Sequence, residues 1–296
     1  MATHAPESAP TAAQTEGLRA WVGRAIEASD LIGPTPAAAL SATLDHEPRH
    51  WRAGEPLPPL WHWLYFLPLD RQRELTQDGH ARRGGFMPPV PLPRRMWAGG
   101  RFEFHEPLLI GESALRSSRI VSIEEKRGRS GALVFVCVRH ALVHAASGAP
   151  AVTEEHDIVY RAAPRPGEAA AAPIPAPADA AFSRQVEPSA TLLFRYSALT
   201  FNAHRIHFDR RYCIEQEGYP GLVVHGPLLA TLLVDLLLRQ HPQLQLRRFS
   251  FKAVRPVFDV APFTVAGRIA VDGRSARLWA ADPGGALAMD ATAEFT

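Results

Sequence analysis

Cysteine and lysine are both scarce in this chain, and the first scarcity excludes whole classes of protein. The 296 residues include two cysteines, too few for a disulfide scaffold or a Cys-rich zinc site. Cys137 lies in the apolar run 134–138, where a buried thiol is expected. Lysine occurs only at Lys126 and Lys252, and the 32 basic residues nearly balance the 30 acidic ones. The chain therefore lacks the basic excess of a dedicated nucleic-acid binder.

Targeting and membrane-spanning segments are also missing from the pattern. The first 17 residues contain neither a lysine or arginine nor an apolar run, and a signal peptide has both. The most apolar stretch, 226–238, is interrupted by Asp235 and falls short of the roughly 20 residues that cross a bilayer. With 46% hydrophobic and 21% charged residues, we expect a globular, cytoplasmic protein without a membrane partner.

A segment with little to bury divides the chain into two halves. Residues 162–181 are almost entirely alanine, proline, glycine and charged residues, a composition typical of a linker. We therefore expect a first unit at 1–161 and a second unit at 182–296.

The two halves share short strings in the same order. Arg101–Phe104 reads RFEF and Arg248–Phe251 reads RFSF, and the string GRS follows at 128–130 and again at 273–275. This order favours a duplicated, hairpin-rich unit. Alternation in the RFEF string and the apolar run Ala132–Val138 predict strands, with GRS in the turns.

Three helices are expected, at Ala13–Ala28, Pro36–Leu44 and Pro227–Arg239. Leucines cover most of the surface of the last one, which predicts a helix wrapped by other elements. One buried helix in each half, followed by a run of strands, favours antiparallel sheets and an α+β class.

Polar and titratable residues concentrate between residues 195 and 229. The string FNAHRIHFD at 201–209 holds two histidines, an asparagine and an aspartate, and GLVVHGPLL at 221–229 places His225 and Gly226 directly before the buried helix. A glycine there lets a ligand approach the free N–H groups of the helix, where the dipole favours developing negative charge.

The two strings also suit a solvated polar loop. The side chains of His204, His207 and Asp209 suit a metal site. However, the spacing is not that of HExxH and no further ligand is obvious. Ser197 lacks the GxSxG elbow of a Ser-His-Asp hydrolase. We therefore expect no metal and no cofactor.

These strings resemble the MaoC-like hydratase/dehydratase family, which has the hotdog fold. More narrowly, they resemble the type 2 hydroxyacyl-thioester dehydratases and the mesaconyl-C4-CoA/itaconyl-CoA hydratase group. Residues 58–68, 84–108 and 154–161 resemble the amino-terminal half of the double-hotdog members, so the resemblance covers about 15–161 and 183–296. It implies a single-chain double hotdog, in which each half is an antiparallel sheet wrapping a long central helix.

The family motif D-x-N-P-x-H assigns roles by alignment. With its histidine on His207, the aspartate falls on Asn202, the asparagine on His204 and the proline on Arg205. Hydration of an unsaturated thioester needs a group that moves protons and a donor for the enolate oxygen. His207 suits the first role and the backbone N–H of Gly226 the second. Asn202 can only hold a water, because an amide does not titrate.

Basic residues supply candidates for substrate binding. Arg205 suits a distal carboxylate, and the basic cluster 247–255 suits coenzyme A phosphates or is a solvated strand face. The full set of candidate substrate-binding residues is Arg205, His204, Tyr196, His225, Arg248, Lys252 and Arg255.

The resemblance implies a hydro-lyase that reversibly hydrates an acyl-CoA thioester, with a short branched dicarboxylyl group such as mesaconyl-C4-CoA or itaconyl-CoA. The first half has no FNAHRIH equivalent, so we expect one active site per chain, built by the second half, beside a non-catalytic first half. Alternatives are an acyl-carrier-protein dehydratase, a thioesterase that recruits Asp209, and a non-catalytic thioester-binding subunit. A homodimer is also allowed.

Overall fold

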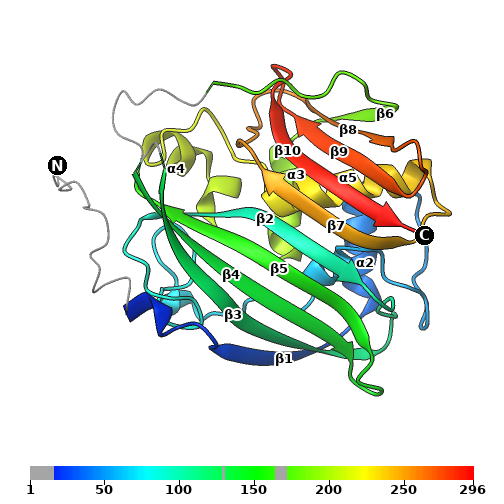
Figure 1. The fold of residues 1–296 in the computed structure, drawn as a ribbon, viewed down its shortest axis with the longest axis horizontal. Coiled ribbons are helices and arrows are strands. Elements are labelled where there is room, and N and C mark those ends of the chain that lie inside the picture. The colour runs from blue at the N-terminus through cyan, green and yellow to red at the C-terminus, as the bar shows by residue number, and fades with distance from the viewer. Residues whose placement is uncertain (1–16, 129–130, 164–171) are drawn as a thin grey trace.

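A single antiparallel sheet organises the molecule. The computed structural model describes residues 17–128, 131–163 and 172–296. Its ten strands have the order β1-β3-β4-β5-β2-β7-β10-β9-β8-β6 (Figure 1). Their bounds are β1 Ala25–Leu31, β2 Arg94–Phe104, β3 Ser113–Gly128, β4 Gly131–His144, β5 Pro150–Arg161, β6 Phe182–Val186, β7 Leu246–Ala253, β8 Phe263–Ile269, β9 Ser275–Ala281 and β10 Leu287–Phe295.

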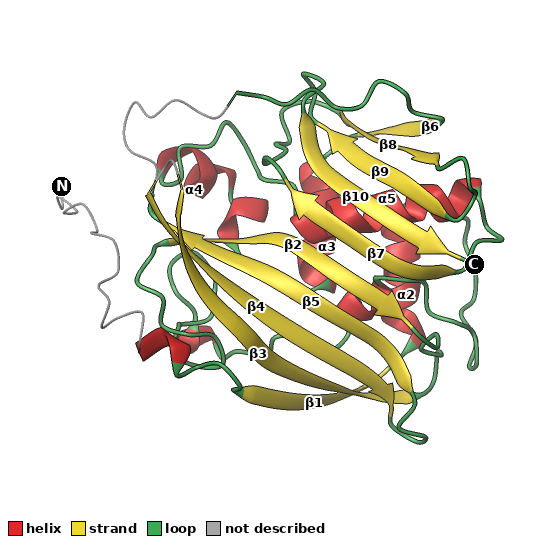
Figure 2. Cartoon of the chain, in the orientation of Figure 1, coloured by secondary structure: helices red, strands yellow, loops and turns green. Residues whose placement is uncertain are grey.

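The main helices cover one face of this sheet (Figure 2). The helical segments are α2 Pro34–Thr43, α3 Ala190–Leu199, α4 Arg210–Glu215 and α5 Gly226–Gln240, with short 3-10 turns η1 Trp61–Leu64, η2 Gln72–Glu74 and η3 Arg205–His207. Within the described residues, no helix is long and apolar enough to cross a bilayer. The fold is the expected α+β double hotdog.

Pairing of β2 with β7 joins the two halves. The strands are antiparallel, and Phe102 lies opposite Phe249. The repeated strings RFEF and RFSF therefore pair with each other at the centre of the sheet. Five strands lie on each side of this seam, so the two half-sheets form one continuous surface.

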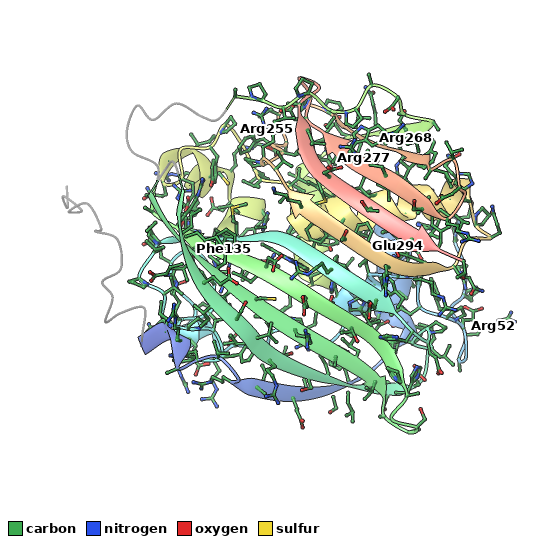
Figure 3. All side chains as sticks on the ribbon, viewed as in Figure 1. Arg52, Phe135, Arg255, Arg268, Arg277 and Glu294 are labelled. Atoms are coloured by element: carbon green, nitrogen blue, oxygen red, sulfur yellow. The ribbon has the colours of Figure 1, made fainter. Side chains whose placement is uncertain are left out.

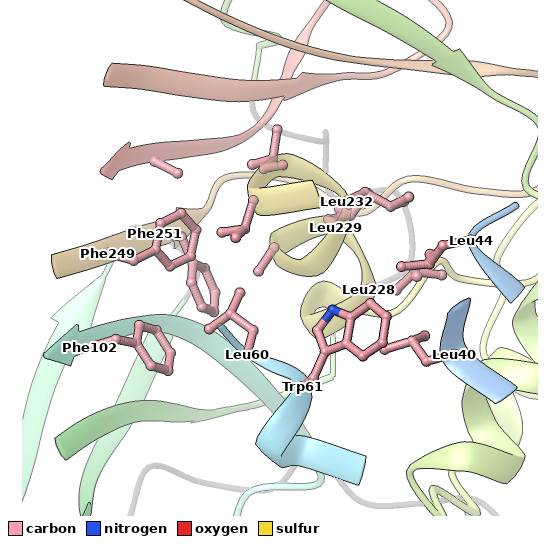
Figure 4. Close-up of a cluster of buried hydrophobic side chains, with 14 of the residues drawn as sticks. Leu40, Leu44, Leu60, Trp61, Phe102, Leu228, Leu229, Leu232, Phe249 and Phe251 are labelled. Carbon is pink, nitrogen blue, oxygen red and sulfur yellow. The ribbon is translucent and has the colours of Figure 1, made fainter. Parts of the chain in front are cut away.

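The core is built on α5 and on phenylalanines from both sides of the seam. Every residue of α5 from Leu228 to Leu237 is buried, as the leucine pattern predicts. Phe102, Phe249 and Phe251 are buried in the same cluster, and Figure 4 shows leucines of α5 facing Trp61 and Leu60 of the first half. Neither half therefore has a core of its own at the seam.

One helix prediction needs correction. The segment expected to be helical at 13–28 is helical only at 17–19 among its described residues, and Ala25–Leu31 instead forms β1 on the edge of β3. Backbone pairing with β3 satisfies every second peptide group there, which outweighs a weak helical pattern. The helix expected at Pro36–Leu44 is present as α2, with 10 residues against 15 in α5.

The first GRS string, 128–130, lies partly outside the described residues, whereas the second leads from a turn into β9.

Replacing Phe102 with alanine should destabilise both halves together. The ring packs on Phe249 across the seam, with centroids 5.9 Å apart, and the loss of a buried phenylalanine costs about 3–5 kcal/mol. Urea unfolding followed by tryptophan fluorescence should show one transition at lower urea. Val271→Ala, at a fully exposed position, is the control and should change the free energy of unfolding by less than about 0.5 kcal/mol. Two separate transitions in Phe102→Ala would contradict a shared core.

Candidate active site

His207 ends the turn η3 and is held in one tautomer. Its side chain is buried, and Nδ1 lies 2.7 Å from the carbonyl oxygen of Val223. A carbonyl only accepts hydrogen bonds, so Nδ1 carries the proton and donates it. The lone pair is therefore on Nε2, which is the atom able to take a proton.

Burial also keeps this imidazole neutral. It lowers the pKa of His207 to about 4, although the hydrogen bond to Val223 raises the pKa and opposes the shift. Removing a charged group from water disfavours its charged form. At neutral pH the ring is thus uncharged and ready to act as a base.

The amino-terminal end of α5 lies beside His207. The helix begins at Gly226, followed by Pro227, and no side chain caps it. A Cβ atom on Gly226 would meet no atom within 4 Å, so there is open space beside the first turn. The ring of His225, the residue before Gly226, stacks on His207 with centroids 3.7 Å apart and planes 18° apart. Base and helix N-terminus are therefore adjacent.

His225 is buried behind this contact. Its Nε2 lies 2.8 Å from the hydroxyl oxygen of Ser197, and its Nδ1 is buried without a hydrogen-bond partner among the described residues. Burial, and after it His207, keeps the pKa of His225 well below its ordinary value. Tyr196 packs edge-on against the ring, and its hydroxyl lies 3.5 Å from Thr231 Oγ1. Tyr196 thus packs against His225, and its predicted role in binding substrate stays a prediction.

Asn202 shapes the turn that carries the histidines. Its Oδ1 accepts a hydrogen bond from the N–H of His204, 3.0 Å away, and its own N–H donates to the carbonyl of Ser197. The amide oxygen is thus engaged, and the side-chain NH₂ is the group that can bind a water molecule.

The loop that carries His80, in the first half, completes the site, and it is not among the residues predicted from the sequence. The ring of His80 lies 3.9 Å from the ring of His204, which in turn packs edge-on against His207. His80 Nδ1 lies 2.9 Å from a carboxylate oxygen of Asp78, so it donates to that oxygen. The site is therefore assembled from both halves and not from the second half alone. The Asp-Gly step at 78–79 signals a turn, but nothing in the sequence places that turn here.

The loop docks through its backbone. The carbonyl of Asp78 accepts from the N–H of Arg205 at 2.9 Å. Gly79 has φ +91°, and a Cβ built there would lie 1.7 Å from the carbonyl oxygen of Ala203. Only glycine allows the two backbones to approach this closely.

Burial is the main influence on the charge of His80 and His204. It lowers the pKa of His80, Asp78 opposes that shift, and the nearby charges of Arg95 and Arg83 lower the pKa further. Burial and the neighbouring His80 and His207 also lower the pKa of His204. Both histidines are thus held neutral.

Within the part of the chain that the structure describes, two groups of side chains have the donor atoms that a metal ion would need. One is Asp78, His80 and His204, and the other is His140, Glu154 and His156 in the first half; in each group the atoms lie within 4.8 Å of one another. At the first group the positive charge of Arg95 opposes a dication. The His204–His207–Asp209 set considered from the sequence is not brought together in this way, because Asp209 pairs with Arg205.

Arg205 does not face a substrate carboxylate. Its Nη2 and Nε lie 2.7 and 3.1 Å from Asp209 Oδ2, and Nη1 lies 3.1 Å from the carbonyl of Gln77. The guanidinium also lies over the ring of Tyr212. The guanidinium of Arg205 is thus bound to Asp209 and links the 77–79 loop to η3, and its role in substrate binding stays a prediction.

The predicted basic cluster lies on the other face of the sheet. Along β7, Phe249 and Phe251 are buried, whereas Arg248 and Lys252 alternate with them and are exposed. Arg248 pairs with Glu103 at 3.1 Å and with Glu294 at 3.7 Å; Figure 3 shows Glu294 on the side of the sheet away from the helices. Arg255 pairs with Asp282 at 3.2 Å. The solvated strand face is the better reading of this cluster.

Comparison with known proteins identifies the family of the chain. The family model for hydroxyacyl-thioester dehydratase type 2 matches residues 60–259. The chain is 49% identical over 279 residues to mesaconyl-C4-CoA hydratase of Chloroflexus aurantiacus, covering 93% of this chain and 97% of the relative. It is 28% identical over 270 residues to the mitochondrial hydroxyacyl-thioester dehydratase type 2 of Schizosaccharomyces pombe, covering 80% and 87% of the two chains.

Solved structures show the same fold. A MaoC-like dehydratase superposes with a TM-score of 0.71 at 16% identity, covering 93% of this chain and 98% of the other. A Mycobacterium tuberculosis protein described as having a double hotdog fold superposes with a TM-score of 0.58 at 13% identity, covering 95% and 98%.

Fold and site together define a double-hotdog hydro-lyase that acts on acyl thioesters. The chain belongs to the hydroxyacyl-thioester dehydratase type 2 family.

The pKa of His207 fixes the expected pH dependence. A base works when it is unprotonated, so a pKa lowered to about 4 moves the loss of activity to acid pH. The value of kcat/KM for hydration should be level between about pH 8 and pH 5.5 and should fall only below that range. A decline already centred near 6.5, the ordinary pKa of histidine, would show that His207 is not buried as described.

Gly79→Ala should impair catalysis through the position of the loop. Relief of the 1.7 Å approach to Ala203 must move His80 away from His204, and a shift of about 1 Å in a catalytic group can cost about 10²-fold. Steady-state kcat/KM measures the effect. Gly54→Ala shares the positive φ, at +84°, but its Cβ meets no atom within 4 Å. Gly54→Ala therefore separates the effect of backbone strain from the effect of the close approach. Equal losses of kcat/KM in both variants would refute the docking role of Gly79.

Proposed function

We propose that the chain reversibly hydrates an α,β-unsaturated acyl-CoA whose β carbon carries a carboxylate, as in mesaconyl-C4-CoA. The observation that carries the reaction type is the neutral His207, with its free Nε2, stacked on the residue that precedes the first turn of α5. The 49% identity to a mesaconyl-C4-CoA hydratase over nearly the whole chain supports the substrate class and the coenzyme A carrier.

The catalytic steps follow from these groups. The NH₂ of Asn202 holds a water molecule, and Nε2 of His207 takes one proton from it as its oxygen bonds to Cβ. The π electrons move to the thioester oxygen, which receives the N–H of Gly226 at the positive end of the α5 dipole. The imidazolium of His207 then returns the proton to Cα, and the enolate collapses to the thioester. One water is added, and the reverse sequence removes it.

The position of the substrate carboxylate restricts the site that can bind it. In mesaconyl-C4-CoA the methyl group and the carboxylate are both attached to Cβ, the carbon that receives the hydroxyl. The product is therefore a tertiary alcohol. The carboxylate must therefore lie next to the catalytic histidines.

The contacts of Asp209 argue against thioester hydrolysis. This carboxylate accepts from the N–H of Tyr212 at 3.0 Å and from the guanidinium of Arg205, and both hold its pKa below the ordinary value. It caps α4 and is not placed to activate water beside His207.

A substrate panel tests the proposal. Mesaconyl-C4-CoA should lose its unsaturated-thioester absorbance without release of free thiol, whereas His207→Gln should lower kcat by about 10²–10⁴-fold. His105→Gln, on the exposed end of the sheet, is the matched control and should retain activity. Thiol release at the rate of turnover, or no reaction with any enoyl-CoA, would overturn the assignment.

A further inference from the structure

Arg95 is set apart from the other arginines near the site by its lack of a partner. The others are engaged: Arg83 donates to the carbonyls of Val90, Leu92 and Pro93, Arg94 pairs with Glu217 and Tyr219, and Arg205 pairs with Asp209. Among the described residues, Arg95 has no hydrogen bond, ion pair or ring contact, although its side chain is half-buried. A half-buried guanidinium without an acceptor is costly unless a ligand supplies one.

The strand register places Arg95 on the face of the sheet that the helices cover. Arg95 lies opposite Tyr160 in the pairing of β2 with β5, and directly opposed residues point to the same face. Tyr160 is fully buried. Trp97, two residues further along β2, packs on His156 and on Phe251. Arg95 therefore faces the interior between the halves, unlike Arg248 and Lys252.

The same face brings Arg95 toward the loop that carries His80. Tyr160, which lies opposite Arg95, has the guanidinium of Arg83 over its ring at 5.1 Å, and Arg83 follows His80 by three residues. In agreement with this placement, the charge of Arg95 adds to burial in lowering the pKa of His80 and of His204. The rings of His80 and His204 are 3.9 Å apart and tilted by 43°, and His204 packs edge-on against His207.

We propose that Arg95 binds the substrate carboxylate on Cβ and so selects dicarboxylyl thioesters over plain enoyl thioesters. This inference rests on the proposed function and names the residue that provides its specificity. A guanidinium presents two N–H donors in the geometry of a carboxylate. The carboxylate is bonded directly to the carbon that receives the hydroxyl, so its receptor has to lie on the inner face beside the histidine cluster, the face on which the strand register places Arg95. The phosphates of coenzyme A are separated from that carbon by the whole pantetheine arm.

This binding mode also orients the reaction. A carboxylate fixed on Arg95 turns one face of Cβ toward the water held between Asn202 and His207. A substrate with a methyl group in place of the carboxylate leaves the guanidinium desolvated and unpaired. The preference for the carboxylate substrate over the methyl substrate should therefore exceed what a change of size alone produces.

The test uses two pairs of thioesters that differ only by carboxylate and methyl. Methylsuccinyl-C4-CoA and isovaleryl-CoA are unreactive ligands for calorimetry, and mesaconyl-C4-CoA and 3-methylcrotonyl-CoA are the corresponding substrates. Wild type should favour the carboxylate member of each pair by roughly 10–100-fold. Arg95→Gln should lose that preference while the Kd of isovaleryl-CoA changes by less than about threefold, and Arg95→Lys should fall between them. Arg268→Gln, an exposed arginine paired with Asp179, removes the same charge and should behave as wild type.

The outcomes separate the two proposals. No turnover of mesaconyl-C4-CoA by wild type would overturn the proposed function, and the role of Arg95 with it. Turnover by wild type with unchanged discrimination in Arg95→Gln would overturn the role of Arg95 alone. So would an equal loss of both ligands, which would assign the guanidinium to the coenzyme A phosphates. If Arg95→Gln does not fold, Arg95→Lys decides, because it keeps the charge and must still weaken only the carboxylate ligand.

Discussion

Backbone hydrogen bonds between β2 and β7 hold the two halves in one register, and the site depends on that register. Because Phe102 lies opposite Phe249, the inner faces of both half-sheets are continuous, and α5 packs against side chains from each. Arg95 and Trp97 lie on β2 before the seam, so they face the same interior as the catalytic turn. A slip of one residue would turn these side chains to the outer face. Catalytic geometry in this enzyme is thus set by main-chain pairing far from the histidines.

In the catalytic turn, burial and not a neighbouring carboxylate determines the pKa of His207. An acid at position 202, as in the wider family motif, would stabilise the imidazolium of a nearby histidine and raise its pKa. Asn202 has no charge, so burial dominates and the pKa of His207 lies near 4. The neighbouring rings of His204 and His225 are also neutral and cannot compete for the proton at physiological pH. The departures from the motif therefore form one consistent arrangement with a single proton-moving group.

Local patterns in the sequence predicted the α+β class and the buried helix, and the family resemblance added the double hotdog. The leucine spacing predicted α5, and the His-Gly-Pro start predicted its free N-terminus beside His207. Contacts between distant segments left no comparable signal. Neither the docking of Gly79 on Ala203 nor the inward orientation of Arg95 has a periodicity that could reveal it. The partner of Arg205 has a signal in the sequence, since Asp209 follows four residues later and pairs with it.

The backbone contact between Gly79 and Ala203 also bears on how such chains can recombine. In a dimer of two identical units every substitution occurs twice, whereas in a fused chain each half diverges by itself. In this chain the first half has a shorter helix than the second, and its His80 lies against His204 of the other half. The halves have thereby ceased to be interchangeable modules. A chimera that joined the first half of one relative to the second half of another would work only if the 77–80 loop and the 202–205 turn came from the same parent.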